Sequence, residues 1–429
     1  MCPEIKSPSK KIELFCALNF ILLVSIGLNY FFEQNKDYQF QAPFIIKIIP
    51  DLLFILIFIF FGFRKKIVKA SIRNTVSICQ LITALIILTH LFSRLDLIEW
   101  MHFYFRNYIL HSLAFFILPS LIRSQKHFIY FYKLFVKYLL ILSVASLLLY
   151  ILGISYEGRF ISFFKDPLRS SYINTAFILI FILPEMAFAS RNQKILYINF
   201  FLIFLSILLG ASFGAIIILI ISILFLFLGY RYFLGKKFKF RVLSVSAFLV
   251  AIGSHVTGFL NILENRFLNM IYNPLFNPHS DPLAVSTSIS SRLNQYLLFF
   301  NSIQNESVAS LLFGNYSAEH IITSDSNYLQ IFYNLGFIGL VTFLAMNFYI
   351  LKTCFDILRN YKKNVSGKNE LYFLYCLGFS AFLLTMVIFG FNFVSITSQF
   401  PFSYIYFLLI GGVFAIRNLQ NKKLSLGLP

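Results

Sequence analysis

Long apolar blocks alternate with short polar segments along most of the chain, and a polar stretch at 261–326 interrupts this pattern. A membrane-spanning helix needs about 20 apolar residues. The sequence holds twelve blocks of roughly this kind, at 11–32, 44–63, 74–93, 102–122, 128–153, 171–189, 195–210, 215–230, 242–260, 327–351, 370–392 and 399–416. Because lipid cannot satisfy backbone polar groups, each block is predicted to be a helix. The pattern therefore predicts an all-α polytopic membrane protein with about 12 transmembrane helices.

The blocks also suggest how the chain is organised. Residues 1–260 form a predicted bundle of about nine helices with a short outer loop at 154–170, and 261–326 form a long outer loop. Three helices and a tail follow at 327–429. Only the ASFG turn separates the blocks at 195–210 and 215–230, so a single long helix there, and eleven spans in all, is the alternative.

Composition agrees with this class, since 59% of the residues are hydrophobic and only 12% are charged. The formal net charge of +19 would suit a nucleic-acid partner, but the positions of the basic residues favour another explanation. Cytoplasmic loops of membrane proteins collect Lys and Arg. With both termini inside, the inner segments hold 25 basic residues and the outer segments 7. The charge therefore predicts orientation, with cytoplasmic termini, and we expect no nucleic-acid partner.

The long outer loop contains a second kind of pattern. In the stretch 290–305, apolar residues recur at helical spacing, and polar residues lie mostly on the opposite side. This pattern predicts an amphipathic helix on the membrane surface or packed over the spans. A turn through Gly314 is expected to follow before the next span begins near Asn327.

The short outer loop carries Arg159 and Arg169, with Ser170 and Ser171 predicted to open the next span. Ser is a favoured helix N-cap, and a helix N-terminus attracts anions. Two guanidinium groups beside such an end would suit a diphosphate, which Arg binds through paired hydrogen bonds. Contact with lipid head groups is the alternative role for these arginines. In the long loop, Arg292 at the start of the amphipathic helix is a better candidate for phosphate binding than Arg266, which is expected to pair with a nearby acid.

Other polar residues are weaker candidates. Arg106 enters the fourth predicted span from its outer end, where it is either functional or reaches the interface. His320 lies five residues before Asp325 and is either a base or a surface histidine. The seven His show no metal-ligand spacing, and the five Cys show no CxxC pair, so the sequence predicts neither a metal site nor a cofactor.

Three segments, taken in order, resemble a known family. EGRFISFFKDPLRSSY, SRLNQYLLFFNSIQNESVASLLFGNYS and DSNYLQIFYNLGFIGL resemble segments of the O-antigen ligase and polymerase superfamily of bacterial inner-membrane glycosyltransferases. The resemblance covers roughly 150–350, and the rest matches only as topology. The ligase branch is expected to carry His where this chain has Asp325, which favours the polymerase branch, of Wzy type.

The resemblance implies a GT-C-like fold and a reaction. Such enzymes join undecaprenyl-diphosphate-linked oligosaccharide repeat units into an O-antigen or capsule at the periplasmic face of the inner membrane. Arg159, Arg169 and Arg292 would hold the departing diphosphate, and Asp325 or Glu157 would deprotonate the acceptor hydroxyl. Tyr328 in the closing signature is a further candidate residue of the substrate site. A chain-length regulator and a flippase are the implied protein partners.

Three other functions remain open from the sequence. A lipid-linked oligosaccharide flippase would also have about twelve spans, but it is expected to consist of two similar halves with short loops. A ligase would transfer a finished glycan to lipid A core or to protein. An ion-coupled transporter that uses Lys47 and Asp51 is the most remote alternative.

Overall fold

The computed structural model describes residues 10–34, 44–62, 112–152, 155–156, 159–160, 167–188, 193–210, 213–234, 297, 300–301, 303–304, 306–314, 326–363, 370–388 and 402–425. These residues are almost entirely helical, apart from two short strands that pair with each other. The predicted spans at 74–93 and 242–260, and the first half of the one at 102–122, lie outside the described residues.

Five helices among the described residues are long and apolar enough to cross a membrane, as expected for a multi-pass membrane protein. They are α6 (Gln125–Ile151), α10 (Phe213–Leu234), α16 (Asn327–Lys363), α17 (Glu370–Ile388) and α18 (Phe402–Ser425). The remaining helices are α1 (Lys10–Gln34), α2 (Phe44–Gly62), η2 (Leu113–Phe116), α5 (Ile117–Leu121), α7 (Pro167–Phe177), η3 (Ile178–Ile182), α8 (Leu183–Phe188), α9 (Gln193–Leu209) and α15 (Val308–Phe313).

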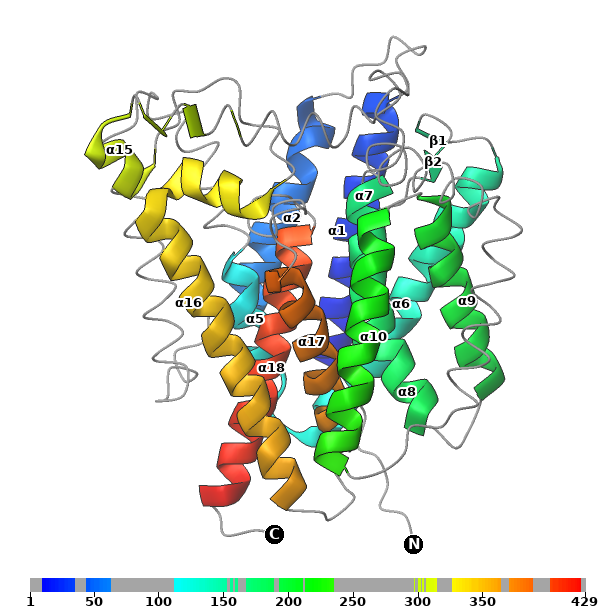
Figure 1. Cartoon of the computed structure of the whole chain (residues 1–429). Coiled ribbons are helices and arrows are strands. Elements are labelled where there is room, and N and C mark those ends of the chain that lie inside the picture. The colour runs from blue at the N-terminus through cyan, green and yellow to red at the C-terminus, as the bar shows by residue number, and fades with distance from the viewer. Residues whose placement is uncertain are drawn as a thin grey trace, which may run out of the picture.

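The structure separates α9 and α10 at the ASFG turn, so these blocks form two helices and not one long helix. Gly210 ends α9 by donating its N–H to the carbonyl of Ser206 at 3.1 Å, and α10 begins at Phe213. The two helices run in opposite directions (Figure 1).

The bundle has two distinct ends (Figure 1). The loop end, at the top of the figure, carries β1 (Ser155–Tyr156), β2 (Arg159–Phe160), α15 and the starts of α7 and α16. The basic end, at the bottom, is where α6 and α17 begin and where α10, α16 and α18 end. Helix α1 also begins at the basic end (Figure 1).

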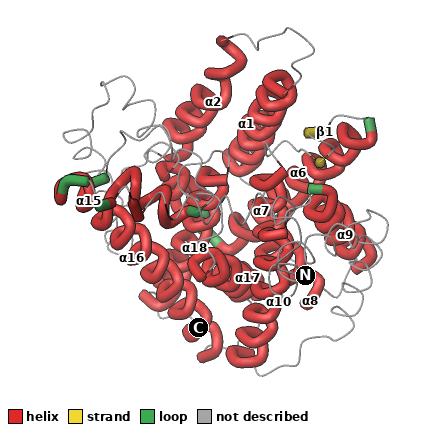
Figure 2. The backbone as a smooth tube through the Cα atoms, turned by 45° about the horizontal axis from the view of Figure 1, so that its top comes forward, coloured by secondary structure: helices red, strands yellow, loops and turns green. Residues whose placement is uncertain are grey.

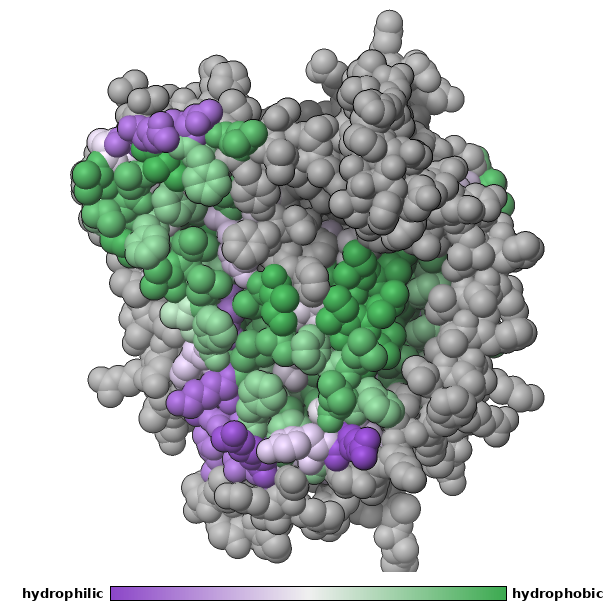
Figure 3. Space-filling model, in the orientation of Figure 1, coloured by the Kyte–Doolittle hydropathy of each residue, from purple (hydrophilic) through white to green (hydrophobic). Residues whose placement is uncertain are grey.

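The two C-terminal helices occupy the interior of the bundle. In the most apolar stretches of α17 and α18, 78% and 83% of the residues are buried inside the protein, whereas in that of α6 only 33% are buried. The tilted view also shows α17 and α18 surrounded by other helices (Figure 2). On the face over α16, α17 and α10, apolar side chains gather across the middle, and hydrophilic ones border them above and below (Figure 3). A lipid-facing belt has this distribution.

The apolar helical segment that begins with α7 contains a π-helical part, η3, before α8. Pro184 has no N–H for the usual helical bond, and a π segment relieves the resulting mismatch. The Tyr132 hydroxyl donates to the carbonyl of Phe181 in this segment. Gly378 of α17 lies so close to the Leu179 carbonyl that a Cβ there would clash with it. The bulge is thus accommodated by one tyrosine and one glycine from neighbouring helices.

Candidate functional site

The short outer loop forms a small hairpin that leads into α7. Strands β1 and β2 are antiparallel, with Ser155 opposite Phe160 and Tyr156 opposite Arg159. This pairing holds the backbone of Arg159 beside that of Tyr156, at the loop end of the bundle (Figure 1). Glu157 lies outside the described residues.

The start of α7 corrects the sequence-based prediction. The helix begins at Pro167 and not at Ser171, because Pro is well suited to the first helical position, where no N–H is needed. Arg169 is therefore the third residue of the helix and lies in its first turn. Ser170 and Ser171 lie within the helix, where both are fully buried, so neither is its N-cap.

Polar side chains are buried along the first turns of α7. The Thr175 hydroxyl lies 2.9 Å from the Ser171 carbonyl and 3.4 Å from the Ala215 carbonyl of α10. Asn174 is 1% exposed, and its Oδ1 accepts no hydrogen bond within the described part of the chain. An apolar block that buries this many polar groups at its loop end is costly unless they serve packing or binding.

The second part of the candidate site is a reciprocal contact between two glycines, which we call the glycine lock. Gly314 ends α15 with φ +93°, and Gly336 lies inside α16 with φ +67°. A Cβ on Gly314 would lie 2.5 Å from the carbonyl oxygen of Asn334. A Cβ on Gly336 would meet the backbone of Leu312 and Phe313. Each glycine therefore makes room for the backbone that carries the other.

The glycine lock bends α16. Its first part, up to Leu335, runs across the loop end, and the remainder descends through the bundle (Figure 1). The sequence predicted a span at 327–351, but the descending part starts only after Gly336 and continues to Lys363. Positive φ is easily adopted only by glycine, which explains why the bend occurs at this residue.

The first turn of α16 is held by a helix cap and by a hydrogen bond to a neighbouring helix. The buried Ser326 caps the helix, since its Oγ accepts from the Leu329 N–H at 3.4 Å and its carbonyl accepts from the Gln330 N–H at 3.0 Å. The Tyr328 hydroxyl donates to the carbonyl of Val387 at the end of α17. This bond makes Tyr328 a tie between two helices. Asp325, which immediately precedes Ser326, lies outside the described residues.

Sequence reasoning missed the buried amides of this region. Gln330 is 7% exposed, and its Oε1 accepts no hydrogen bond among the described residues. Asn334 is also buried. An amide within an apolar block is a visible signal in the sequence, as for Asn174 in the block at 171–189, and it could have indicated these positions.

The remaining predicted residues divide into two groups. The backbones of Arg159 and Arg169 belong to elements at the loop end, as does the capped start of α16. Arg106, Arg292 and His320 lie outside the described residues, so their positions remain predictions. Of the predicted amphipathic helix, Leu297 and Phe300 are helical and expose 53% and 60% of their surface, and the polar Asn301 is exposed as well.

Within the described part of the chain, no group of three His, Cys, Asp or Glu side chains could hold a metal ion. No protein-family model matches this chain, and no curated protein matches it.

Proposed function

We propose that this protein is a membrane glycosyltransferase that polymerises undecaprenyl-diphosphate-linked oligosaccharide repeat units into a surface polysaccharide. One observation carries the proposal most directly. The β1–β2 hairpin with the start of α7, and the α15–α16 glycine lock, are about 150 residues apart in sequence but lie at the same end of the bundle (Figure 1). These elements contain parts of the three segments that resemble the O-antigen ligase and polymerase superfamily.

The orientation of the bundle is part of the proposal. Loops rich in Lys and Arg stay in the cytoplasm. The basic end would therefore face the cytoplasm, and the loop end would face the periplasm of a bacterial inner membrane. Lipid-linked repeat units, which are presented at that face, would reach the loop end from the surrounding lipid.

In the proposed reaction, a hydroxyl oxygen of the incoming repeat unit bonds to the anomeric carbon of the growing chain. The bond from that carbon to the carrier diphosphate breaks, and the diphosphate leaves with the electron pair. Asp325, or Glu157 in its place, takes the hydroxyl proton. Arg159, Arg169 and Arg292 offset the charge on the leaving diphosphate. The N-terminus of α7, directly beside Arg169, adds the positive end of a helix dipole.

The proposal predicts the surface glycan of a deletion strain. Cells that lack the protein should carry single repeat units in place of long chains, as seen by electrophoresis of the extracted glycan. A flippase would instead leave lipid-linked units on the inner face of the membrane. A ligase would leave no glycan attached to its acceptor. Either of these results would replace the proposal.

Substitutions in the complementing gene test the roles of the residues. Arg159→Ala and Arg292→Ala should abolish long chains at normal protein levels, since loss of one charge-stabilising donor lowers a rate by about 10²–10³. Arg266→Ala, in the same long loop as Arg292, is the matched control and should keep them. Asp325→Asn should also lose activity if Asp325 is the base. Long chains of ordinary length in the first two variants would refute the diphosphate assignment.

A further inference from the structure

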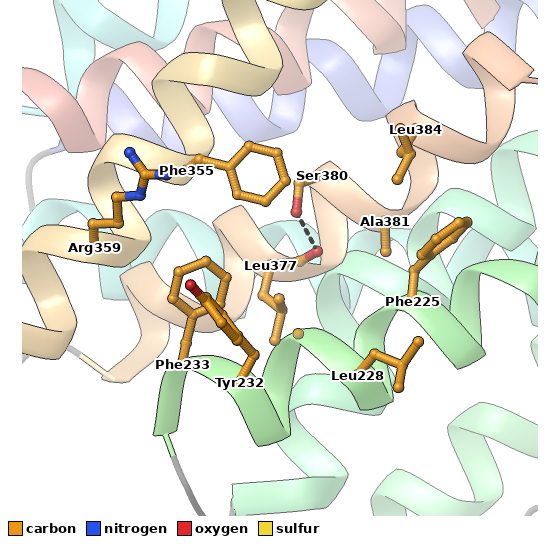
Figure 4. Close-up of a pocket in the computed structure, with 11 residues that line it drawn as sticks. Phe225, Leu228, Tyr232, Phe233, Phe355, Arg359, Leu377, Ser380, Ala381 and Leu384 are labelled. Atoms are coloured by element: carbon orange, nitrogen blue, oxygen red, sulfur yellow. Dashed lines mark hydrogen bonds between the residues drawn. The ribbon is translucent and has the colours of Figure 1, made fainter.

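A groove separate from the loop end lies between α10, α16 and α17 (Figure 4). It has a volume of about 550 Å³. Its walls are mainly large apolar side chains: Phe225, Leu228, Phe233, Phe355, Leu377 and Leu384. Gly229 forms part of the wall, since a Cβ there would lie 2.7 Å from Leu377 Cδ1.

The serine hydroxyl in the groove wall already has a hydrogen-bond partner. The Ser380 hydroxyl donates to the carbonyl of Leu377 at 2.9 Å, within α17 (Figure 4). A bound molecule would therefore meet an apolar surface along most of its length. Leu228 and Phe355 are 58% and 38% exposed, so the groove opens to the outside of the bundle, within its apolar belt.

One edge of the groove is positively charged. Arg359 lines the groove from α16, and its side chain extends along that helix toward Phe355 (Figure 4). Arg359 is exposed and makes no hydrogen bond or ion pair within the described residues, nor does the neighbouring Asp356, which lies outside the groove lining. Arg231, also exposed, precedes the lining residue Tyr232 at the end of α10. The groove thus combines an apolar wall with positive charge toward the basic end.

We infer that this groove binds an anionic phospholipid from the leaflet at the basic end of the bundle, with an acyl chain along the apolar wall and the phosphate at Arg359. Both parts of the groove are needed for this inference. A guanidinium group at the basic end of the apolar belt, with no hydrogen bond or ion pair among the described residues, suits a lipid phosphate. The apolar wall favours an occupant with an acyl chain over a free inorganic anion. The site is independent of the reaction proposed at the loop end.

The test uses the full chain, purified in detergent and mixed with phosphatidylglycerol, phosphatidylcholine of the same acyl chains, or inorganic phosphate. Thermal unfolding and native mass spectrometry then report binding. Phosphatidylglycerol should raise the melting temperature more than phosphatidylcholine does, and it should remain bound in the spectrometer. Phosphate alone should have no such effect. An equal effect of phosphate would overturn the inference, because it would indicate a free-anion site.

Two variants separate the parts of the site. Arg359→Ala should lose the preference for phosphatidylglycerol, whereas Lys126→Ala, an exposed cation at the start of α6 outside this groove, should keep it. Gly229→Leu keeps Arg359 but places a larger side chain in the groove, and its Cβ would meet the flexible Leu377 side chain. This variant should lose bound phosphatidylglycerol. If either Arg359→Ala or Gly229→Leu keeps the preference for phosphatidylglycerol over phosphatidylcholine, the assignment is wrong. A lipid-independent dimer disrupted by these variants would assign the groove to a second copy of the chain.

Discussion

Tyr404 and Tyr406 are two residues apart on α18 and project about 200° from each other around the helix. They consequently reach different neighbours. The Tyr404 hydroxyl donates to Asn19 Oδ1 of α1, and the Tyr406 hydroxyl donates to Asn347 Oδ1 of α16. Each of these amides in turn donates its Nδ2 at 2.8 Å to a carbonyl one turn earlier in its own helix. Single polar side chains therefore join the central helix to both sides of the bundle.

Tyr404→Phe is expected to lower the free energy of unfolding by about 1 kcal/mol, since it leaves a buried acceptor without its donor. Unfolding in mixed detergent micelles measures this loss. The double variant with Asn19→Leu should lose less than the two single losses added together, because both substitutions remove the same bond. Tyr232→Phe, whose side chain is 69% exposed, serves as the control. If the loss in the double variant equals the sum of the two single losses, the hydrogen bond contributes nothing to stability.

At the scale of elements, the glycine lock determines how α15 and the first part of α16 lie across the loop end. Helix α15 has only six residues and could not be stable on its own. Its capping Ser307 accepts from the Ser310 N–H at 3.1 Å, and Gly314 ends it by donating to the Ser310 carbonyl at 2.8 Å. The rest of its stability must come from docking against the bend in α16.

Gly336→Ala is expected to destabilise the protein by about 2–4 kcal/mol, because it combines an unfavourable backbone conformation with a clash against the backbone of α15. Gly314→Ala should behave alike for the same two reasons. Gly229→Ala is the matched control, since that glycine has ordinary φ and its new Cβ would meet only a flexible side chain. Thermal unfolding of the purified variants provides the comparison. A control as unstable as Gly336→Ala would show that the lock has no special role.

At the scale of the whole molecule, helices alternate between the two ends, so segments far apart in the sequence share one end. Among the described residues, Lys126, Arg231 and Lys363 belong to the ends of α6, α10 and α16 at the bottom of Figure 1, and the hairpin and α15 lie at the top. If the basic end faces the cytoplasm, Ser307 and Lys126 must lie on opposite sides of the membrane.

Cysteine labelling of intact cells measures this arrangement. An impermeant maleimide added outside spheroplasts should label Ser307→Cys and leave Lys126→Cys unlabelled until the membrane is broken. Both side chains are exposed, so access to them depends on the membrane and not on burial. The three described native cysteines, Cys16, Cys354 and Cys376, are buried and should add little background. The reverse labelling pattern would invert the orientation and remove the basis of a periplasmic active site.

The sequence by itself determined the class of the protein and much of the element order. Apolar length and the absence of hydrogen-bonding partners in lipid require helices, and this reasoning needs no tertiary contact. It located α6, α10 and α17 within four residues at each end, and it marked Gly314 as a turn, but α18 continues to Ser425, nine residues beyond its predicted end. The number of spans remains a prediction, because several predicted blocks lie outside the described residues.

Only the tertiary structure decided where helices bend and which residues meet. The bend in α16 depends on the approach of Leu312 to Gly336, and the buried ends of α7 depend on neighbours from α9 and α10. The tie from Tyr328 to Val387 joins residues 59 positions apart, and no local pattern encodes it. Hydrophobicity acts on each segment independently, whereas close backbone approach and buried hydrogen bonds depend on partners that only the assembled bundle supplies.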